Sequence, residues 1–245
     1  MRIDVIDHPD AEHPARPAAT VVLLRDGADE LELLMIERGA ATAFGGMWAF
    51  PGGVIEDADV PPGTEPDPLP AARRAGVRET MEETGLVVDA GTLVWWSHWL
   101  PPGRNALSTK RFSTWFFLAP AAGRHEDPGP ASGAGHGSAG DGEVASVRWI
   151  APAVALAMQE RGEIVLAPPT YVTLTQLALY GDVASAVRAA EPRYFATEVA
   201  FDGATRLCVW EGDVAYGGGD HLAEGPRHRL AMDEVAGWRY INTVG

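Results

Sequence analysis

Three glutamates stand close together in the segment Arg78-Glu79-Thr80-Met81-Glu82-Glu83-Thr84-Gly85-Leu86. On a helix that turns about 100° per residue, Glu79, Glu82 and Glu83 fall within an arc of about 100°. Such neighbours repel one another by roughly 0.2–0.5 kcal/mol per exposed pair, and hard divalent cations prefer carboxylate oxygen. The spacing therefore predicts either a solvated acidic face balanced by nearby arginines or a face that binds divalent cations.

The rest of this segment has the composition of a helix over Ala71–Thr84, and Gly85 stands where a left-handed C-terminal cap is expected. Small residues extend the acidic stripe towards the N-terminus: Ala72, Ala75 and Gly76. The side expected to pack on the protein is the opposite one, which carries Val77, Met81 and Thr84. The acidic face is expected to be hard to bury.

A double glycine precedes this helix, in Phe50-Pro51-Gly52-Gly53. The pattern Gly53…Asp59…Arg78-Glu79-x-x-Glu82-Glu83-x-Gly85-Leu86 resembles the Nudix box, the signature of a family of hydrolases that cut diphosphate linkages. The resemblance implies that Glu79, Glu82 and Glu83 bind Mg²⁺ or Mn²⁺, with the Gly53 carbonyl as a further ligand. It also implies that Arg78 orients a helix glutamate, and that Glu82 and Glu79 belong to the catalytic machinery.

The chain departs from the family pattern at three points. Asp59 replaces a glutamate, and as a shorter acid it is expected to reach a metal only through water. Thr80 replaces an aliphatic residue, so its hydroxyl needs a partner. About eleven extra residues separate Asp59 from Arg78 within the Pro-rich segment Asp57–Pro70, an exposed insertion that costs little free energy.

An inserted box resembles a subgroup of the family that includes peroxisomal coenzyme A diphosphatases. Two flanking stretches are similar to that subgroup, Trp99-Leu100-Pro101-Pro102 with Arg111-Phe112-Ser113-Thr114-x-Phe116-Phe117, and Pro168-Pro169-Thr170. Arg111 is expected to bind substrate on this basis. The upstream coenzyme A signature is met only at its start, in Leu33-Leu34-x-x-x-Arg38, and Pro101 keeps ADP-ribose-like substrates open.

Two further site residues are expected outside the box. The attacking water needs a base, for which Glu143 is the candidate, with Glu126 and Asp141 also eligible. Trp48 lies beside the glycines and is expected to stack on a nucleobase. His98 is more typical of a half-buried polar residue, and the cluster Arg227-His228-Arg229 either meets a distal phosphate or forms a solvated turn.

Two other functions compete with hydrolysis. A Nudix-fold module that senses a nucleotide without cleaving it usually lacks box glutamates, and this chain keeps all three. An isomerase acting on diphosphate esters requires a reactive cysteine, whereas Cys208, the single cysteine, lies far from the box and is interpreted as a small core residue.

The bulk composition limits the partners. The 245 residues carry a net charge of −15 and no basic cluster long enough to bind long nucleic acids. No stretch is long and apolar enough to span a bilayer, and the N-terminus lacks a signal pattern, so no membrane partner and a cytoplasmic location are expected. The expected partner is a small nucleotide-derived diphosphate, and a homodimer is left open.

The order of the expected elements is β–β–loop–α–β–β–β–α, which favours an α/β class with a mixed sheet between helices, the Nudix-type α/β/α sandwich. Residues 1–17 are expected to form an N-terminal arm, 18–153 the Nudix domain with a flexible loop at 121–142, and 154–245 an extension packed on that domain. The expected strands and helices are Thr20–Leu24, Leu31–Glu37, Leu86–Val88, Leu93–Trp99, Arg111–Leu118, Val144–Ile150, Pro152–Arg161, Thr170–Tyr180, Asp182–Ala190, Thr197–Phe201, Thr205–Trp210 and Trp238–Thr243. Ala40–Gly53 is expected to be a loop.

Overall fold

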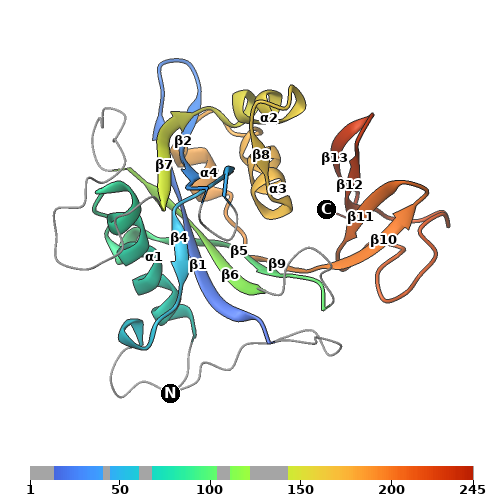
Figure 1. Ribbon diagram of the computed structural model, residues 1–245, viewed down its shortest axis with the longest axis horizontal. Helices are drawn as coiled ribbons and strands as arrows, with labels where there is room; N and C mark the ends of the chain where they lie inside the picture. The colour runs from blue at the N-terminus through green and yellow to red at the C-terminus, as the bar shows by residue number, and fades with distance from the viewer. Residues whose placement is uncertain (1–13, 41–44, 61–67, 104–110, 122–142, 245) are drawn as a thin grey trace.

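The computed structural model describes residues 14–40, 45–60, 68–103, 111–121 and 143–244 (Figure 1). Its main sheet follows the order β8-β3-β2-β1-β6-β5-β9, with β4 paired to β1 and β7 paired to β2. The bounds of these strands are β1 Arg16–Asp26, β2 Leu31–Arg38, β3 Met47–Ala49, β4 Gly52–Val54, β5 Val94–Leu100, β6 Phe112–Pro120, β7 Val144–Ile150, β8 Val165–Leu166 and β9 Arg193–Ala196. The sheet is mixed, because β1 pairs with β6 in parallel and with β2 and β4 antiparallel.

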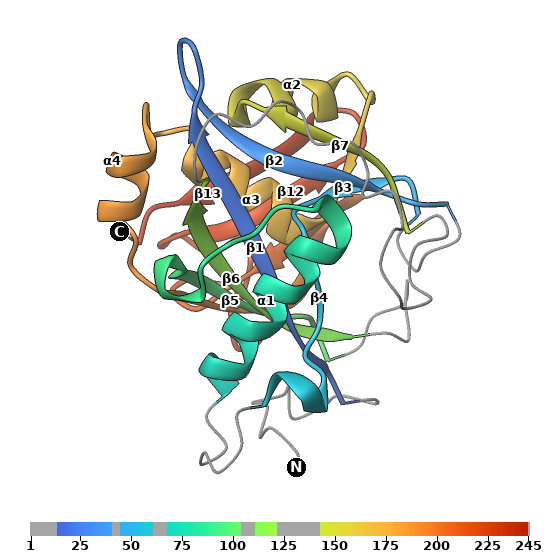
Figure 2. The same cartoon turned by 90° about the vertical axis from the view of Figure 1, so that its left-hand side faces the viewer.

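Helices lie on both faces of this sheet, which confirms the predicted α/β/α architecture. Helix α1 (Pro68–Thr84) crosses β1 and β4 on one face, as Figure 2 shows. The other face carries the helices α2 Pro152–Glu160, α3 Pro168–Leu177 and α4 Val183–Arg188. Each face has its own buried apolar cluster, so the sheet separates two cores.

The stripe of small residues on α1 packs against the sheet. Ala71, Ala72 and Ala75 are fully buried, and a Cβ added at Gly76 would lie 2.8 Å from the Val21 side chain of β1. The predicted orientation of the helix is corrected in part: Thr84 is buried and Val77 packs on the core as expected, whereas Met81, also expected to pack, is 47% exposed. The face that also carries Glu79 and Glu83 is therefore the one that meets the sheet.

Several predicted boundaries are corrected. Ala40–Gly53 contains the short strands β3 and β4 as well as loop, and Leu86–Val88 forms no strand. In Asp57–Pro70 the described residues include a 3₁₀ helix, Asp57–Asp59, and the start of α1 at Pro68, whereas 61–67 lie outside the described residues. Most of the predicted loop 121–142 and of the N-terminal arm also lies outside them.

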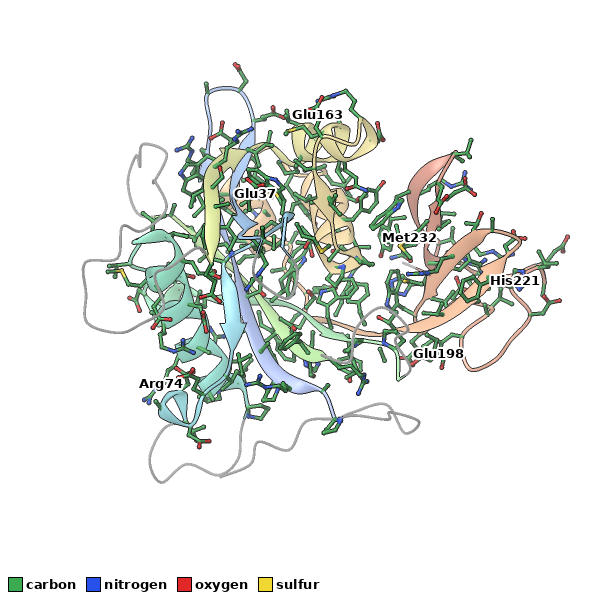
Figure 3. The ribbon with its side chains drawn as sticks, viewed as in Figure 1. Glu37, Arg74, Glu163, Glu198, His221 and Met232 are labelled. Carbon is green, nitrogen blue, oxygen red and sulfur yellow. The ribbon has the colours of Figure 1, made fainter. Side chains whose placement is uncertain are left out.

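The C-terminal region builds a second, antiparallel sheet in the order β10-β11-β12-β13. Its strands are β10 Glu198–Asp202, β11 Thr205–Val209, β12 His228–Asp233 and β13 Gly237–Asn242. One face of this sheet packs towards the main core, and Met232 on β12 points that way (Figure 3). Strands β8 and β9 join the main sheet although they follow residue 153, so the extension completes the main sheet as well as packing on it.

Both interpretations of Arg227-His228-Arg229 are corrected by this sheet. His228 and Arg229 lie in β12, and the buried Arg229 guanidinium donates to both carboxylate oxygens of Asp213, at 2.7 and 2.5 Å. Cys208 is buried in β11, and burial raises the pKa of its thiol to about 11, which agrees with a core role. In the described part of the chain, no helix combines the length and apolar character needed to cross a membrane.

Candidate active site

Glu83 is the most deeply buried acid of α1, with 7% of its surface exposed. Its Oε2 accepts a hydrogen bond from the Gly52 amide at 2.8 Å. Burial raises the pKa of the Glu83 carboxyl to about 8, although the Gly52 amide and the charge of Arg38 act in the opposite direction. Glu83 is thus held against the glycine loop in a place that disfavours its own negative charge.

Glu79 lies against the second glycine of the loop. A Cβ added at Gly53 would overlap the Glu79 carboxylate, so only glycine allows the backbone to approach the acid this closely. Burial raises the pKa of Glu79, and repulsion from Glu82 and Glu143 adds to this, whereas Arg78 opposes it. The two glutamates four residues apart on α1 therefore both meet the double glycine.

Arg78 ties the helix to the segment that precedes it. Its guanidinium donates to the two carboxylate oxygens of Asp59, at 3.2 and 2.9 Å, and to the Val54 carbonyl at 3.0 Å. The hydrogen bond with Asp59 is the main cause that raises the pKa of Arg78. Asp59 is 4% exposed and also accepts from the Glu56 amide, so its carboxylate holds Arg78 and is not directed at a metal through water.

Glu82 differs from the other two box glutamates. Its side chain is 50% exposed and accepts a hydrogen bond from Arg78 Nη1 at 3.1 Å, and the same nitrogen donates to Glu79 at 2.9 Å. An arc of about 100° is wide enough to place one acid in solvent while its neighbours face the sheet. Over the described ranges, no three His, Cys, Asp or Glu side chains are gathered closely enough to hold a metal ion.

Glu143 lies near two glutamates of α1. Its carbonyl accepts a hydrogen bond from the Gly39 amide at 2.8 Å, at the end of β2. Its charge raises the pKa of both Glu79 and Glu83. The structure thus brings the proposed base near two of the box acids, whereas the alternatives Glu126 and Asp141 lie outside the described residues.

The two residues expected to bind substrate are both buried. Trp48 is 7% exposed in the core, and the Arg148 guanidinium lies over its ring at 5.4 Å, so a free face for stacking on a base is missing. Arg111 is 4% exposed and donates to the Pro101 and Pro102 carbonyls at 3.1 Å each. These contacts hold the chain that follows β5, and a role of Arg111 in binding substrate stays a prediction.

His98 is a buried polar residue of strand β5. It shares a hydrogen bond of 2.9 Å with Ser113 and packs on the Trp115 ring. Burial lowers the pKa of His98 to about 4, so its ring is neutral at pH 7. This agrees with its interpretation as a buried polar residue of the fold.

Two groups without a predicted site role lie at Glu83: the Gly52 amide donates to its Oε2, and Arg38 Nη1 lies 3.8 Å from its Oε1. A backbone amide can bind a carboxylate without any particular side chain, so the type of residue does not reveal it. The only sequence signal for Gly52 was the double glycine. Arg38 directly follows the predicted strand Leu31–Glu37, and the start of the coenzyme A signature, Leu33-Leu34-x-x-x-Arg38, was the signal that could have placed it at the site.

The donors at this site fit a hard divalent cation by their chemistry. Glu79 and Glu83 are carboxylates that burial and mutual repulsion leave poorly stabilised as anions, and the backbone of Gly53 lies against one of them. A divalent cation takes such oxygen ligands and offsets their repulsion. Glu82 can join them by rotating its half-exposed side chain away from Arg78.

Comparison with known proteins identifies the family of the chain. The family model described as the NUDIX domain matches residues 14–168. Among solved structures, a NUDIX hydrolase from Alicyclobacillus acidocaldarius is similar, with 24% identity, a TM-score of 0.61, and coverage of 74% of this chain and 99% of that one. The NUDIX domain of Shewanella oneidensis NrtR, complexed with ADP ribose, has 18% identity and a TM-score of 0.47, over 69% of this chain and 90% of that one.

A search of curated proteins finds no match. The solved neighbours carry the fold, and the family model covers well over half of the chain. The chain therefore belongs to the NUDIX family, whose enzymes hydrolyse diphosphate bonds and generally use a divalent cation.

Proposed function

We propose that the chain is a Mg²⁺-dependent hydrolase that cleaves the diphosphate bond of a nucleoside diphosphate linked to another group, with Mn²⁺ as an alternative ion. The observation that carries this proposal is the pair Glu79 and Glu83, held against Gly52 and Gly53 in surroundings that raise the pKa of both carboxyls. A fold that only needed a helix at this position would gain nothing from burying two repelling acids.

In this proposal Glu79, Glu82 and Glu83 hold the cation together with the Gly53 carbonyl. When bound, Mg²⁺ supplies Lewis-acid stabilisation of the charge that builds up on the diphosphate oxygens. Arg78 keeps α1 in register with β4 through Asp59 and Val54, and it orients Glu79 and Glu82. Glu143 is the proposed base that accepts a proton from the attacking water.

Coenzyme A or an acyl-coenzyme A is the substrate class that we place first, on the resemblance of the inserted box and of its flanks. An ADP-ribose-type substrate is the alternative. Both predict the same kind of products, a nucleoside monophosphate and a phosphorylated remainder. The net charge of −15 is compatible with small anions that bind through a cation and unfavourable for long nucleic acids.

One observation favours a second candidate, a module that binds a nucleotide without cleaving it. The three box glutamates are not gathered as a ligand set in the described structure, since Glu82 lies half in solvent on Arg78. Catalysis then requires Glu82 to turn towards Glu79 and Glu83, whereas a binding module requires no such movement.

Product formation separates the two candidates. The purified full chain is incubated with coenzyme A, ADP-ribose, dinucleoside polyphosphates, NADH and nucleotide sugars, each with Mg²⁺ and each with chelator, and the products are identified by mass spectrometry. Hydrolysis that disappears with chelator supports the enzyme. Glu82→Gln is expected to lower turnover by orders of magnitude with unchanged folding, while Glu160→Gln, an exposed acid on α2, should leave it unchanged. Binding without products in every mixture would establish the module instead.

A further inference from the structure

We propose that His228 makes the contact between the C-terminal sheet and the main sheet sensitive to acid, so that the C-terminal sheet opens away more readily when this imidazole takes up a proton. The contact lies at the joint where the chain passes from β9 of the main sheet almost directly into β10 of the second sheet (Figure 1). The device does not require that the chain be a hydrolase.

The ring of His228 packs between the two sheets. Its centroid lies 5.5 Å from that of Phe195 on β9, and Phe195 stacks on Trp99 of β5 at 3.9 Å. From the second sheet, the ring centroids of Trp210 and Tyr240 lie 5.4 and 6.1 Å from that of His228. The imidazole is therefore one of the rings through which the second sheet contacts the main sheet.

The two ring nitrogens of His228 have different surroundings. Nδ1 lies 2.9 Å from the Glu211 carbonyl oxygen, which can only accept, so the hydrogen of the neutral ring sits on Nδ1. Nε2 is buried and finds no hydrogen-bond partner within the described residues. A proton taken up at Nε2 in the closed protein would create a charged donor without an acceptor, and burying such a group costs free energy.

The charged groups around the ring do not compensate for that proton. Burial lowers the pKa of His228, and the charge of Arg193 on β9 adds to this, whereas the Glu211 carbonyl and Asp213 act in the opposite direction. The Asp213 carboxylate is already paired with a buried arginine. Burial raises the pKa of Tyr240 on β13, so its phenol stays neutral in acid and supplies no charge. The closed joint therefore excludes the proton.

Opening of the joint changes this balance. Once the sheets separate, the His228 ring meets water and regains the pKa of an ordinary histidine, about 6.5. Below this pH the opened form binds a proton that the closed form excludes, so opening becomes more favourable as pH falls. Above it both forms are neutral, and the contact keeps its full stability.

The test follows opening of the full chain by hydrogen exchange between pH 5 and pH 7, with mass spectrometry of peptides from β12 and β13. His228→Asn cannot carry a charge, and its amide can still donate to the Glu211 carbonyl. His221→Asn is the matched control, because His221 lies in the loop before β12, 4.0 Å from Asp202. This range stays above the titration of His98, since burial lowers the pKa of that ring to about 4.

The extent of opening in the wild type is compared with that in His228→Asn at the same pH. We expect this ratio to rise about tenfold for each unit of pH below 6.5, until the folded-state pKa of His228 is reached. The control His221→Asn should behave like the wild type. The same dependence on pH in the wild type and in His228→Asn would overturn the inference.

Nitrogen NMR of the histidine rings in the wild type gives a second measurement, which remains available if His228→Asn does not fold. We expect His228 to carry its hydrogen on Nδ1 at pH 7 and to titrate below pH 6.5. A neutral ring with its hydrogen on Nε2, or a pKa at or above 6.5, would contradict the proposed device.

Discussion

Replacing Glu83 by glutamine should remove a loss of stability that the metal-free wild type suffers as pH rises. The folded-state pKa of this carboxyl is about 8, above its ordinary value of 4.5, and burial is the main cause. Below the ordinary value the carboxyl is protonated in both the folded and the unfolded chain, so it costs nothing. Between the two values only the unfolded chain releases the proton, and the free energy of unfolding falls as pH increases.

The size of the effect follows from the shift. Each unit of pH in this window is worth about 1.4 kcal/mol, and the slope flattens as pH approaches the folded-state pKa. From pH 6 to pH 8 the wild type should therefore lose about 2 kcal/mol that Glu83→Gln does not lose. Glutamine keeps an oxygen that can accept from the Gly52 amide, so the variant removes the charge and not the contact.

The assay is urea unfolding of both proteins at several pH values between 5 and 8.5, with chelator present. Glu82→Gln on the same helix is the control, since Glu82 is half exposed, and its curve should run parallel to that of the wild type. The comparison uses the change with pH, because the glutamine amide beside Arg38 can alter stability equally at every pH. If Glu83→Gln and the wild type lose stability in parallel from pH 6 to pH 8, the burial argument is wrong.

Three other substitutions test separate parts of the structure. Gly53→Ala places a methyl group on the Glu79 carboxylate, so we expect metal-dependent turnover to fall by at least about a hundredfold while circular dichroism stays native; near-normal turnover would show that the loop does not contact Glu79. Glu143→Gln should lower kcat and remove the acidic limb of the pH–rate profile, and an unchanged profile would exclude it as the base. Asp213→Asn leaves the buried Arg229 charge without its partner and should cost about 3–5 kcal/mol in urea unfolding; a loss below about 1 kcal/mol would show that the pair is not needed by the C-terminal sheet.

Thr80 shows that a departure from the family pattern can have a simple structural account. Its hydroxyl is fully buried and donates to the Gly76 carbonyl at 2.7 Å, one helical turn earlier. Thr84 repeats this arrangement with the Thr80 carbonyl. Both polar groups are satisfied within the helix, and α1 ends at Gly85 with a φ of +73°, as predicted.

The sequence predicted strands correctly where they are long apolar runs. It did not predict strands that depend on pairing with residues far away in the sequence. Strands β1, β2, β5, β6 and β7 are apolar runs and lie close to their predicted positions. Strand β8 has two residues and exists because Met47 and Trp48 pair with it. Strand β12 contains an arginine that is buried only because Asp213, sixteen residues earlier, receives it. The residues within these strands do not indicate which distant residues will pair with them.

The orientation of α1 explains why the site itself was only half predicted. Ala72, Ala75 and Gly76 were interpreted as neutral members of an acidic stripe, yet their lack of bulk is what lets the helix lie directly on β1. Because α1 lies so close to the sheet, Glu79 and Glu83 of the same stripe are held against β4, whereas Glu82 stays half exposed. There the two glycines of β4 leave room for carboxylates and the Gly52 amide donates to one of them. The burial that makes these acids poor anions in the free protein is therefore a direct consequence of the small residues two turns earlier, and the same packing prepares them to bind a cation.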